Sequence, residues 1–463
     1  MLKNRRYSGI TVACFVLSLC TFSRAQKSLD EVWSEEWMDL SEQIKNGALS
    51  DVHENEVLDP HALITGSDRD PLDIVGRRTA ALLTSHRKLA KTSLLSISGI
   101  QEKLASARVT PVSDAVMRQE RFTEVMAANR EAMFANPAFD FDTVVAMLET
   151  FVECRIVECA RPNAYAVGGG PIMITGLKGS SPKETKLLSG VKVSSGPWAG
   201  KELTGKFSGL ELNWEGTQIY FAATTNDNFW HIFRFDLITK KLDQLTNEKY
   251  DDFDPCVLPS GRIVFTSTRR GGIGRCLLTP QSVTFTLHTM EPDGSDIVPI
   301  SFHETNDWQP SVDNDGMIVY NRWDYFDRHW GTAHHLFLCY PDGRDPRNWH
   351  GNYPLPHNVM TDGITPDQYG KEGNFPNGRA LREDVDMTLR AIPGTRGKYT
   401  ATAVGHHEGF SGSLILIDVN IPDDGKMSQV KRLTPSVKFP EVEGGTHTYG
   451  TCWPLDEKTF MCN

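Results

Sequence analysis

Residues 251–270 read DDFDPCVLPSGRIVFTSTRR, and this stretch decides the fold because its pattern returns along the chain. A turn with glycine is followed closely by a strand of β-branched and aromatic residues: Gly216 stands before IYF, Gly261 before IVF and Gly316 before IVY. Glycine supplies the positive φ that such turns need, and the residues after it favour strands. The stretch therefore predicts a repeated unit with a turn and a strand in every copy.

The second half of each unit is another strand, a second turn and a closing strand. It reads HIFRFDLITKKLDQLT from residue 231, TLHTMEPDGSDIVPIS from 286 and HLFLCYPDGRDP from 335, and a fourth copy runs through KYTATAV and SLILIDVN to VKRLTP. The copies lie about 45 to 80 residues apart, which fits one propeller blade with inserted loops. Four short antiparallel strands per unit are typical of a β-propeller.

Two further stretches extend the repeat. A less regular unit covers residues 139–190, with VVAML, RIVEC and PIMITGL as predicted strands. At the far end, THTYGTCWPLDEKTFMCN contains only the first two strands of one more blade. We predict a mainly β fold in which residues 138–463 form a β-propeller of five blades plus part of a sixth, with an incomplete last blade.

The residues before the repeat, 26–137, have a helical pattern. Ser28 and Glu31 have the spacing of a capping box, and Asn136 and Pro137 end the last stretch with helical periodicity. We interpret this helical N-terminal region as a packing or capping element. Its charged residues are expected to face solvent.

The first 25 residues are predicted to be a signal peptide. Lys3 and Arg5 precede an apolar run over residues 10–22, and Ser23 and Ala25 are small residues at the expected cleavage site. The run is far shorter than the roughly 20 residues that span a bilayer. We therefore expect an exported protein, periplasmic or extracellular, without a membrane span.

Composition limits the partners. The chain has 463 residues, and 48 Lys and Arg against 59 Asp and Glu give a net charge of −11, which disfavours nucleic acid. Of the 9 cysteines, Cys14 and Cys20 lie in the predicted signal peptide. The remaining number is odd, so at least one thiol has no disulfide partner within the chain.

Several specific stretches lie between residues 117 and 463: DFDTVVAM, SFHETNDWQPSVDNDGMIVYNRWDYFDRH, AHHLFLCYPDGRDPR, HGNYPLP and ATAVGHHEGFSGSLILID. Together they resemble exported proteins similar to the alpha subunit of hydrazine synthase, which combine its middle domain with a TolB-like six-bladed propeller. The resemblance implies a TolB-like fold and export. Hydrazine synthase is a multihaem enzyme, but this chain lacks the Cys-x-x-Cys-His motif of c-type haem. We expect no such haem, and hydrazine formation is not carried over.

Propeller geometry places the loop between the second and third strands on the same face as the loop into the next blade. Polar side chains in these loops should therefore converge. The candidates for ligand binding are Arg269, Arg270, Arg322, Asp324 and Arg328. The candidates for metal binding are His303, His329, His335, His406 and His407.

Each set has two interpretations. Imidazoles with a carboxylate can hold zinc or another divalent ion, or they can bond loop amides and fasten neighbouring blades. Arg269 and Arg270 can hold a carboxylate, phosphate or sulfate, or form a salt bridge between blades to Asp251 or Asp252. Asp254 is expected to bond a turn amide.

The leading hypothesis is an exported binding or scaffolding protein for a small anionic or saccharide-like ligand or a partner protein. It depends on the repeat architecture and on the lack of a complete catalytic motif. One alternative is a haem-free, metal-dependent enzyme with a His/Asp site on the loop face. Another is an accessory subunit of a redox complex whose haems lie on other chains.

Overall fold

The computed structural model describes residues 16–18, 28–47, 52–89, 94–150, 165–272, 283–303, 306–323, 334–351, 385–405, 410–422, 428–440, 443–445 and 448–462. Its contacts divide the chain into two compact units. The helical unit contains Met1–Asp140, Lys431–Ser436 and Leu455–Asn463, and the propeller unit contains Phe141–Val430 and Val437–Pro454. Each unit is described by itself.

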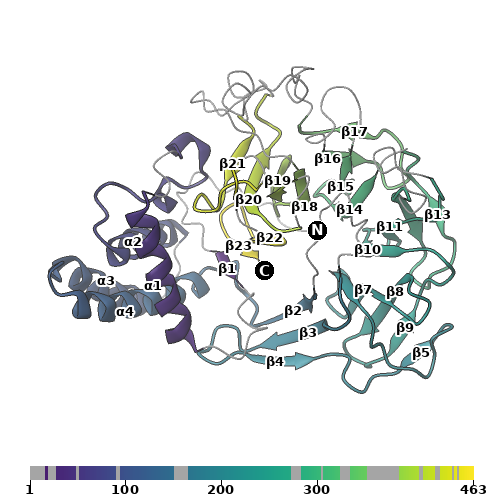
Figure 1. Cartoon of the computed structure of the whole chain (residues 1–463), viewed down its shortest axis with the longest axis horizontal. Coiled ribbons are helices and arrows are strands. Elements are labelled where there is room, and N and C mark those ends of the chain that lie inside the picture. The colour runs from purple at the N-terminus through teal and green to yellow at the C-terminus, as the bar shows by residue number, and fades with distance from the viewer. Residues whose placement is uncertain are drawn as a thin grey trace. The chain divides into compact units, whose positions relative to one another are not determined.

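The helical unit is built from four α-helices and two 3-10 turns within the described residues (Figure 1). They are α1 (Leu29–Lys45), η2 (Glu54–Glu56), η3 (Pro60–Ala62), α2 (Pro71–Leu89), α3 (Leu94–Val109) and α4 (Ala115–Phe134). Ser28 caps α1 in the predicted capping box with Glu31. The short strand β1 (Val16–Ser18) pairs in parallel with β23 (Phe460–Cys462).

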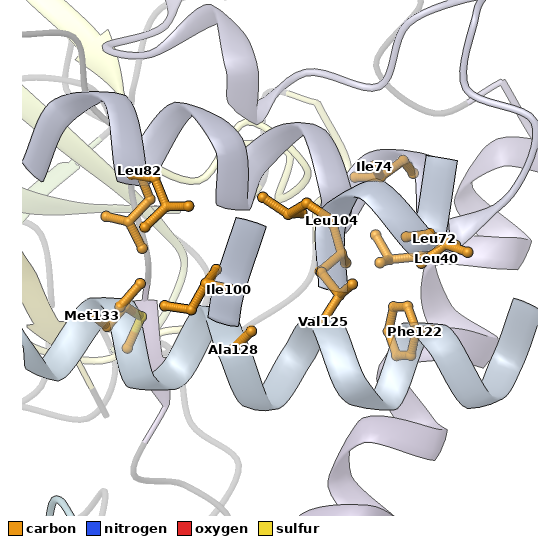
Figure 2. Packing of buried hydrophobic residues seen from close by; sticks show 14 residues of the cluster. Leu40, Leu72, Ile74, Leu82, Ile100, Leu104, Phe122, Val125, Ala128 and Met133 are labelled. Carbon is orange, nitrogen blue, oxygen red and sulfur yellow. The ribbon is translucent and has the colours of Figure 1, made fainter. Parts of the chain in front are cut away.

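One apolar core holds the helices together. Ile74 of α2, Ile100 of α3 and Val125 and Phe122 of α4 are buried in a single cluster (Figure 2). Trp37 of α1 packs edge-on against Phe122, with ring centroids 5.1 Å apart. Because these side chains come from four different helices, burial of their shared apolar surface stabilises the unit as a whole.

The propeller unit is a series of short, mainly antiparallel sheets. Its strands are β2 (Thr143–Leu148), β3 (Gly170–Thr175), β4 (Lys183–Lys186), β5 (Val193–Ser195), β6 (Phe207–Leu212), β7 (Gln218–Thr224), β8 (Trp230–Asp236), β9 (Leu242–Gln244), β10 (Asp252–Val257), β11 (Ile263–Ser267), β12 (Thr286–Met290), β13 (Val298–Pro299), β14 (Asp307–Val312), β15 (Ile318–Trp323), β16 (His334–Cys339), β17 (Arg347–Asn348), β18 (Val385–Ala391), β19 (Lys398–Val404), β20 (Ser413–Asp418) and β22 (Cys452–Pro454), together with Val430, the first residue of β21 (Val430–Arg432). Most pairs join consecutive strands, whereas β5 pairs in parallel with β9 and β16 pairs in parallel with β18. The middle strands are apolar along their length because neighbouring sheets cover both faces.

Each blade has an innermost strand that packs beside the innermost strand of the next blade, in the order β2, β6, β10, β14, β18 and β22. Numbered in chain order, the third, fourth and fifth blades begin at β10, β14 and β18. Glu211 of β6 nevertheless bonds directly to Arg390 of β18, with the carboxylate oxygen 3.0 Å from the guanidinium nitrogen. A row of strands can bring its second and fifth members into contact only if it curves around an axis. The unit is therefore a β-propeller, with β22 beginning the sixth blade (Figure 1).

A β-bulge recurs in four innermost strands. Gly209, Asp254, Gln309 and Thr388 occupy the same place in β6, β10, β14 and β18, each with φ between 50° and 63°. The bulge bends the innermost strand where it would otherwise run straight. The Gln309 carboxamide oxygen accepts a 2.7 Å hydrogen bond from the Thr388 amide, which links two of these bulges. Asp254 thus lies at a bulge in β10, in the position that corresponds to Gln309 of β14.

The strand predictions are confirmed where the structure describes them. VVAML and PIMIT lie in β2 and β3, whereas RIVEC lies outside the described residues. The strand β5 was not predicted, because its pairing with β9 is parallel and distant in sequence. None of the described helices is long and apolar enough to cross a membrane.

Candidate functional site

The structure describes five of the ten predicted site residues. Arg269, Arg270, Arg322, His303 and His335 lie in the propeller unit. The other five lie outside the described residues: Asp324, Arg328, His329, His406 and His407.

The two predicted sets of loops do meet. Arg270 follows β11, and its guanidinium donates a hydrogen bond to the backbone oxygen of His303, which precedes β14. Asp251, just before β10, accepts a 3.1 Å bond from the backbone amide of Trp230 at the start of β8. Loops between second and third strands are therefore joined to loops between blades, as the propeller geometry predicts.

The central feature of this face is a repeated buried aspartate. Asp252, Asp307 and Asp386 each stand two residues before the bulge of an innermost strand, and each is completely buried. A buried carboxylate needs a cation or several hydrogen bonds to offset its loss of hydration. The carboxylates of Asp252 and Asp307 are bound by Arg269 and Arg322, which were predicted to bind a ligand, and that of Asp386 by His335, which was predicted to bind a metal.

Arg269 forms an ion pair with Asp252 within the third blade. Its Nη2 and Nε lie 2.7 Å and 3.1 Å from the two carboxylate oxygens, and Ser267 donates a third bond of 2.6 Å to the same carboxylate. The remaining nitrogen of Arg269, Nη1, binds Glu248 at 2.7 Å. Its side chain is only 12% exposed, and Arg269 therefore forms the predicted salt bridge to Asp252, but within one blade and not between blades.

Arg322 forms an ion pair with Asp307 in the fourth blade. Nε and Nη2 lie 2.7 Å and 3.1 Å from the two oxygens of Asp307, which is the two-pronged geometry of a strong ion pair. The guanidinium also lies 4.8 Å from the centroid of the Phe337 ring. Arg322 is thus bound within its own blade.

Two histidines of the fourth blade lie beside the carboxylate of Asp386 in the fifth blade. His335 Nδ1 lies 3.2 Å from Asp386 Oδ2, and His350 Nε2 lies 3.9 Å from the same oxygen. His350 Nδ1 lies 2.7 Å from the carboxamide oxygen of Gln429, whose own NH₂ group donates to the backbone oxygen of Ile421. The orientation of Gln429 is therefore fixed, and His350 Nδ1 is the donor.

Asp251, the neighbour of Asp252, has an altered acidity. Burial raises its pKa to about 6, and the adjacent Asp252 carboxylate acts in the same direction. The hydrogen bond from the Trp230 amide opposes the rise.

The described residues contain no group of three or more His, Cys, Asp or Glu side chains that can hold a metal ion. His303 and His335 are not brought together in one such group. Three described thiols, Cys256, Cys339 and Cys452, are buried and form no disulfide. Burial raises the pKa of Cys452 to about 12, so this thiol remains protonated and unreactive.

The helical unit contains a cleft that the sequence did not indicate. It has a volume of about 640 Å³ and lies between α2 and α3, with Leu72, Gly76 and Ala107 among its lining residues. Arg69 and Arg108 also line it. Its only sequence signal is the four-residue spacing of small residues along α2, which is equally typical of helix packing.

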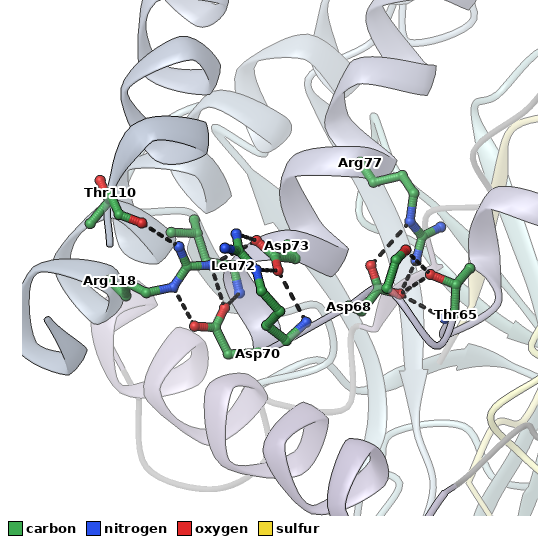
Figure 3. Close-up of polar contacts among 10 residues, drawn as sticks. Thr65, Asp68, Asp70, Leu72, Asp73, Arg77, Thr110 and Arg118 are labelled. Atoms are coloured by element: carbon green, nitrogen blue, oxygen red, sulfur yellow. Dashed lines mark hydrogen bonds and ion pairs between the residues drawn. The ribbon is translucent and has the colours of Figure 1, made fainter. Parts of the chain in front are cut away.

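Figure 3 shows the ion pairs of this region, of which Asp68, Asp73 and Arg77 line the cleft. Arg118 of α4 lies 2.7 Å from Asp73 Oδ1 and 2.8 Å from Asp70 Oδ1, its Nε binds Asp70 Oδ2, and it donates to the backbone oxygen of Thr110. Arg77 binds Asp68 at 2.6 Å. The expectation that the charges of this region face solvent is wrong for Arg118, which is completely buried because Asp70 and Asp73 offset its desolvation.

No family model and no curated protein matches the chain. Among solved structures it is similar to hydrazine synthase of Kuenenia stuttgartiensis, at 13% identity and a TM-score of 0.45, over 68% of this chain and 41% of that one. It is also similar to a putative TolB from Agrobacterium tumefaciens, at 12% identity and a TM-score of 0.36, over 63% of this chain and 80% of that one.

A third similar structure is an oligogalacturonate lyase in complex with manganese, at 10% identity and a TM-score of 0.33, over 63% of this chain and 66% of that one. The matched part of the chain spans less than half the length of the hydrazine synthase chain. These likenesses concern the fold alone. Function is therefore argued from the residues.

Proposed function

We propose that the protein is an exported binding or scaffolding protein whose propeller serves as a rigid frame. The observation that carries the proposal is that three predicted site residues are engaged in contacts within the propeller. Arg269, Arg322 and His335 each bond a buried aspartate of an innermost strand. Side chains that neutralise buried carboxylates stabilise the propeller, and their hydrogen-bonding groups are already occupied, so few remain to bind a substrate.

The proposal also draws on the buried thiols. Catalysis by a cysteine needs an accessible thiolate, whereas Cys256, Cys339 and Cys452 are buried. Burial raises the pKa of Cys256 well above its usual range. These three thiols support packing rather than covalent chemistry.

Elemental analysis of the purified, full-length protein, together with its visible spectrum, tests the proposal against the metalloenzyme alternative. We expect less than a stoichiometric amount of any transition metal and no haem band. One equivalent of zinc, iron or copper that is lost in His407→Ala would overturn the proposal. His53→Ala, in the helical unit, is the matched control for the loss of one histidine.

A further inference from the structure

We infer that the cleft between α2 and α3 is a binding site for a small organic anion with an apolar body. The inference deepens the proposed binding function by assigning it a site and a class of ligand. It begins with the shape of the cleft. The volume of about 640 Å³ lies within the range of roughly 300 to 1,000 Å³ that is typical of small-molecule sites.

The floor of the cleft is apolar. Leu72 and Leu104 belong to the buried core of the helical unit, and their outer surfaces line the cleft together with Ala81 and Ala107. Gly76 of α2 also lines the cleft, and a Cβ added there would meet no atom within 4 Å, so the space beside this residue is open. The floor can therefore accept an apolar body.

The rim of the cleft carries positive charge that the protein does not use. Arg77 is fully engaged with Asp68 and with the backbone oxygens of His61 and Leu63. Arg108, in contrast, is exposed and has no hydrogen bond or ion pair to any of the described residues. Its guanidinium is available to an anion.

Arg69 adds a second donor. Its Nε and Nη2 bind Asp73 at 2.6 Å and 2.8 Å, while the side chain is 50% exposed and Nη1 makes no bond to the described residues. Burial acts against ionisation of Asp73, but the bonds from Arg69 and Arg118 outweigh it and hold the pKa of Asp73 well below its usual range. Asp73 therefore stays charged and keeps Arg69 in place.

The balance of charge selects an anion. The two carboxylates that line the cleft, Asp68 and Asp73, are each committed to an arginine, and Arg108 is left as the uncompensated group. Guanidinium groups bind carboxylate, sulfonate and sulfate through paired hydrogen bonds. An apolar floor beneath such donors fits a ligand with an acidic head and a hydrocarbon or aromatic body.

Titration of the full-length protein with 8-anilinonaphthalene-1-sulfonate, an aromatic sulfonate whose fluorescence rises on apolar surfaces, tests this inference. We expect saturable binding at a single site. Arg108→Ala should raise the Kd at least about tenfold, because it removes the unpaired cation. Gly76→Leu should abolish binding by filling the floor.

Matched controls are Gly99→Leu and Arg396→Ala. Gly99 lies on α3, has open space around its Cβ position and does not line the cleft, and Arg396 is 84% exposed on the propeller unit. Both should bind the probe like the unmodified protein. Cooperative thermal unfolding of every variant shows that the probe reports a site and not a loosened core.

Binding that is unchanged in both Gly76→Leu and Arg108→Ala would overturn the inference, and so would the lack of saturable binding to the unmodified protein. Equal affinity for the uncharged N-phenyl-1-naphthylamine would overturn the assignment of an anion. A stoichiometric metal in the elemental analysis would instead overturn the proposed function, and the result of the probe titration would still stand. The two failures are therefore distinguishable.

Discussion

Asp307 and Asp386 occupy the same position in successive blades, two residues before the bulge, and both are completely buried. Asp307 is held by Arg322 of its own blade through two short hydrogen bonds. Asp386 is held by His335 of the preceding blade, whose Nδ1 lies 3.2 Å from one of its oxygens, while His350 Nε2 lies 3.9 Å from the same oxygen. The same strand position thus serves an ion pair within a blade in one case and a joint between blades in the other.

Backbone contacts also join the fourth and fifth blades at Asp386. The Asn321 side chain of the fourth blade donates a 2.6 Å hydrogen bond to the backbone oxygen of Asp386, and His334 and Val385 form a parallel pair between β16 and β18. Asp386 Oδ1 has no hydrogen-bond partner among the described residues. The comparison teaches that a repeated acidic position does not imply a repeated function: its neighbours decide what it stabilises.

The largest expected effect is at the arginine pair. Arg322→Ala leaves the carboxylate of Asp307 buried without its cation, which should lower the free energy of unfolding by about 3 to 5 kcal/mol. Urea unfolding measures this loss. Arg344→Ala, which removes an ion pair from a side chain that is 79% exposed, is the control and should cost less than about 1 kcal/mol. A loss below that level in Arg322→Ala as well would mean that Asp307 does not depend on its arginine.

Asp251 extends the comparison to pH. Its folded-state pKa of about 6 exceeds the usual value of 3.8, so its contribution to stability is fully present below about pH 4 and is lost as the pH rises through 6. Asp251→Asn keeps the acceptor for the Trp230 amide and removes the charge. It should raise the stability by about 2 kcal/mol at pH 7.5 and leave it unchanged at pH 3.5. An equal change at both pH values would contradict this assignment.

Asp386→Asn sharpens the difference between the two aspartates. The carboxamide oxygen can still accept from His335, and no guanidinium is left buried without a partner, so the expected cost is only about 1 kcal/mol. Chemical denaturation at pH 7.5 provides the measurement, with Asp307→Asn as the matched substitution. If both variants lose the same amount, the joint between the blades is an ion pair as strong as that of Arg322.

The smallest expected effect concerns the bulge itself. Gly209 has the bulge conformation, with φ 63°, but Phe207 replaces the aspartate two residues before it. Gly209→Ala should cost about 0.5 to 1 kcal/mol, since a left-handed conformation disfavours a Cβ. Thermal unfolding beside Gly66→Ala, a position without positive φ, measures the difference. No loss in Gly209→Ala would show that the bulge tolerates any residue.

The sequence predicted the strands well because they are local. The runs after Gly261 and Gly316 became β11 and β15, since turn chemistry and β-branched residues act over a few positions. β5 was not predicted, because its three residues take their conformation from β9. The position of Arg269 on the loop face was also predicted, but its binding to Asp252 was one of two open alternatives.

The site could be predicted only in part, because burial depends on contacts between distant residues. His350 and Asp386 are separated by 36 positions and meet only when the fourth and fifth blades pack together. Arg118 and Asp70 are separated by 48 positions and meet only when α4 lies against the start of α2. Neither pattern has a local signal, and the charged residues of α2 and α4 are equally consistent with solvated helix faces.

The sequence by itself determined the repeated strands, the helical pattern of residues 26–137 and the face on which the polar loops gather, because propensity and periodicity are properties of short segments. The tertiary structure alone decided which charges are committed and which are available. Arg322 and Arg108 are the same residue type, yet one is bound by a buried aspartate and the other lies exposed beside a cleft. The free energy of a charge depends on its burial and its partners, and both are set by the packing of distant segments.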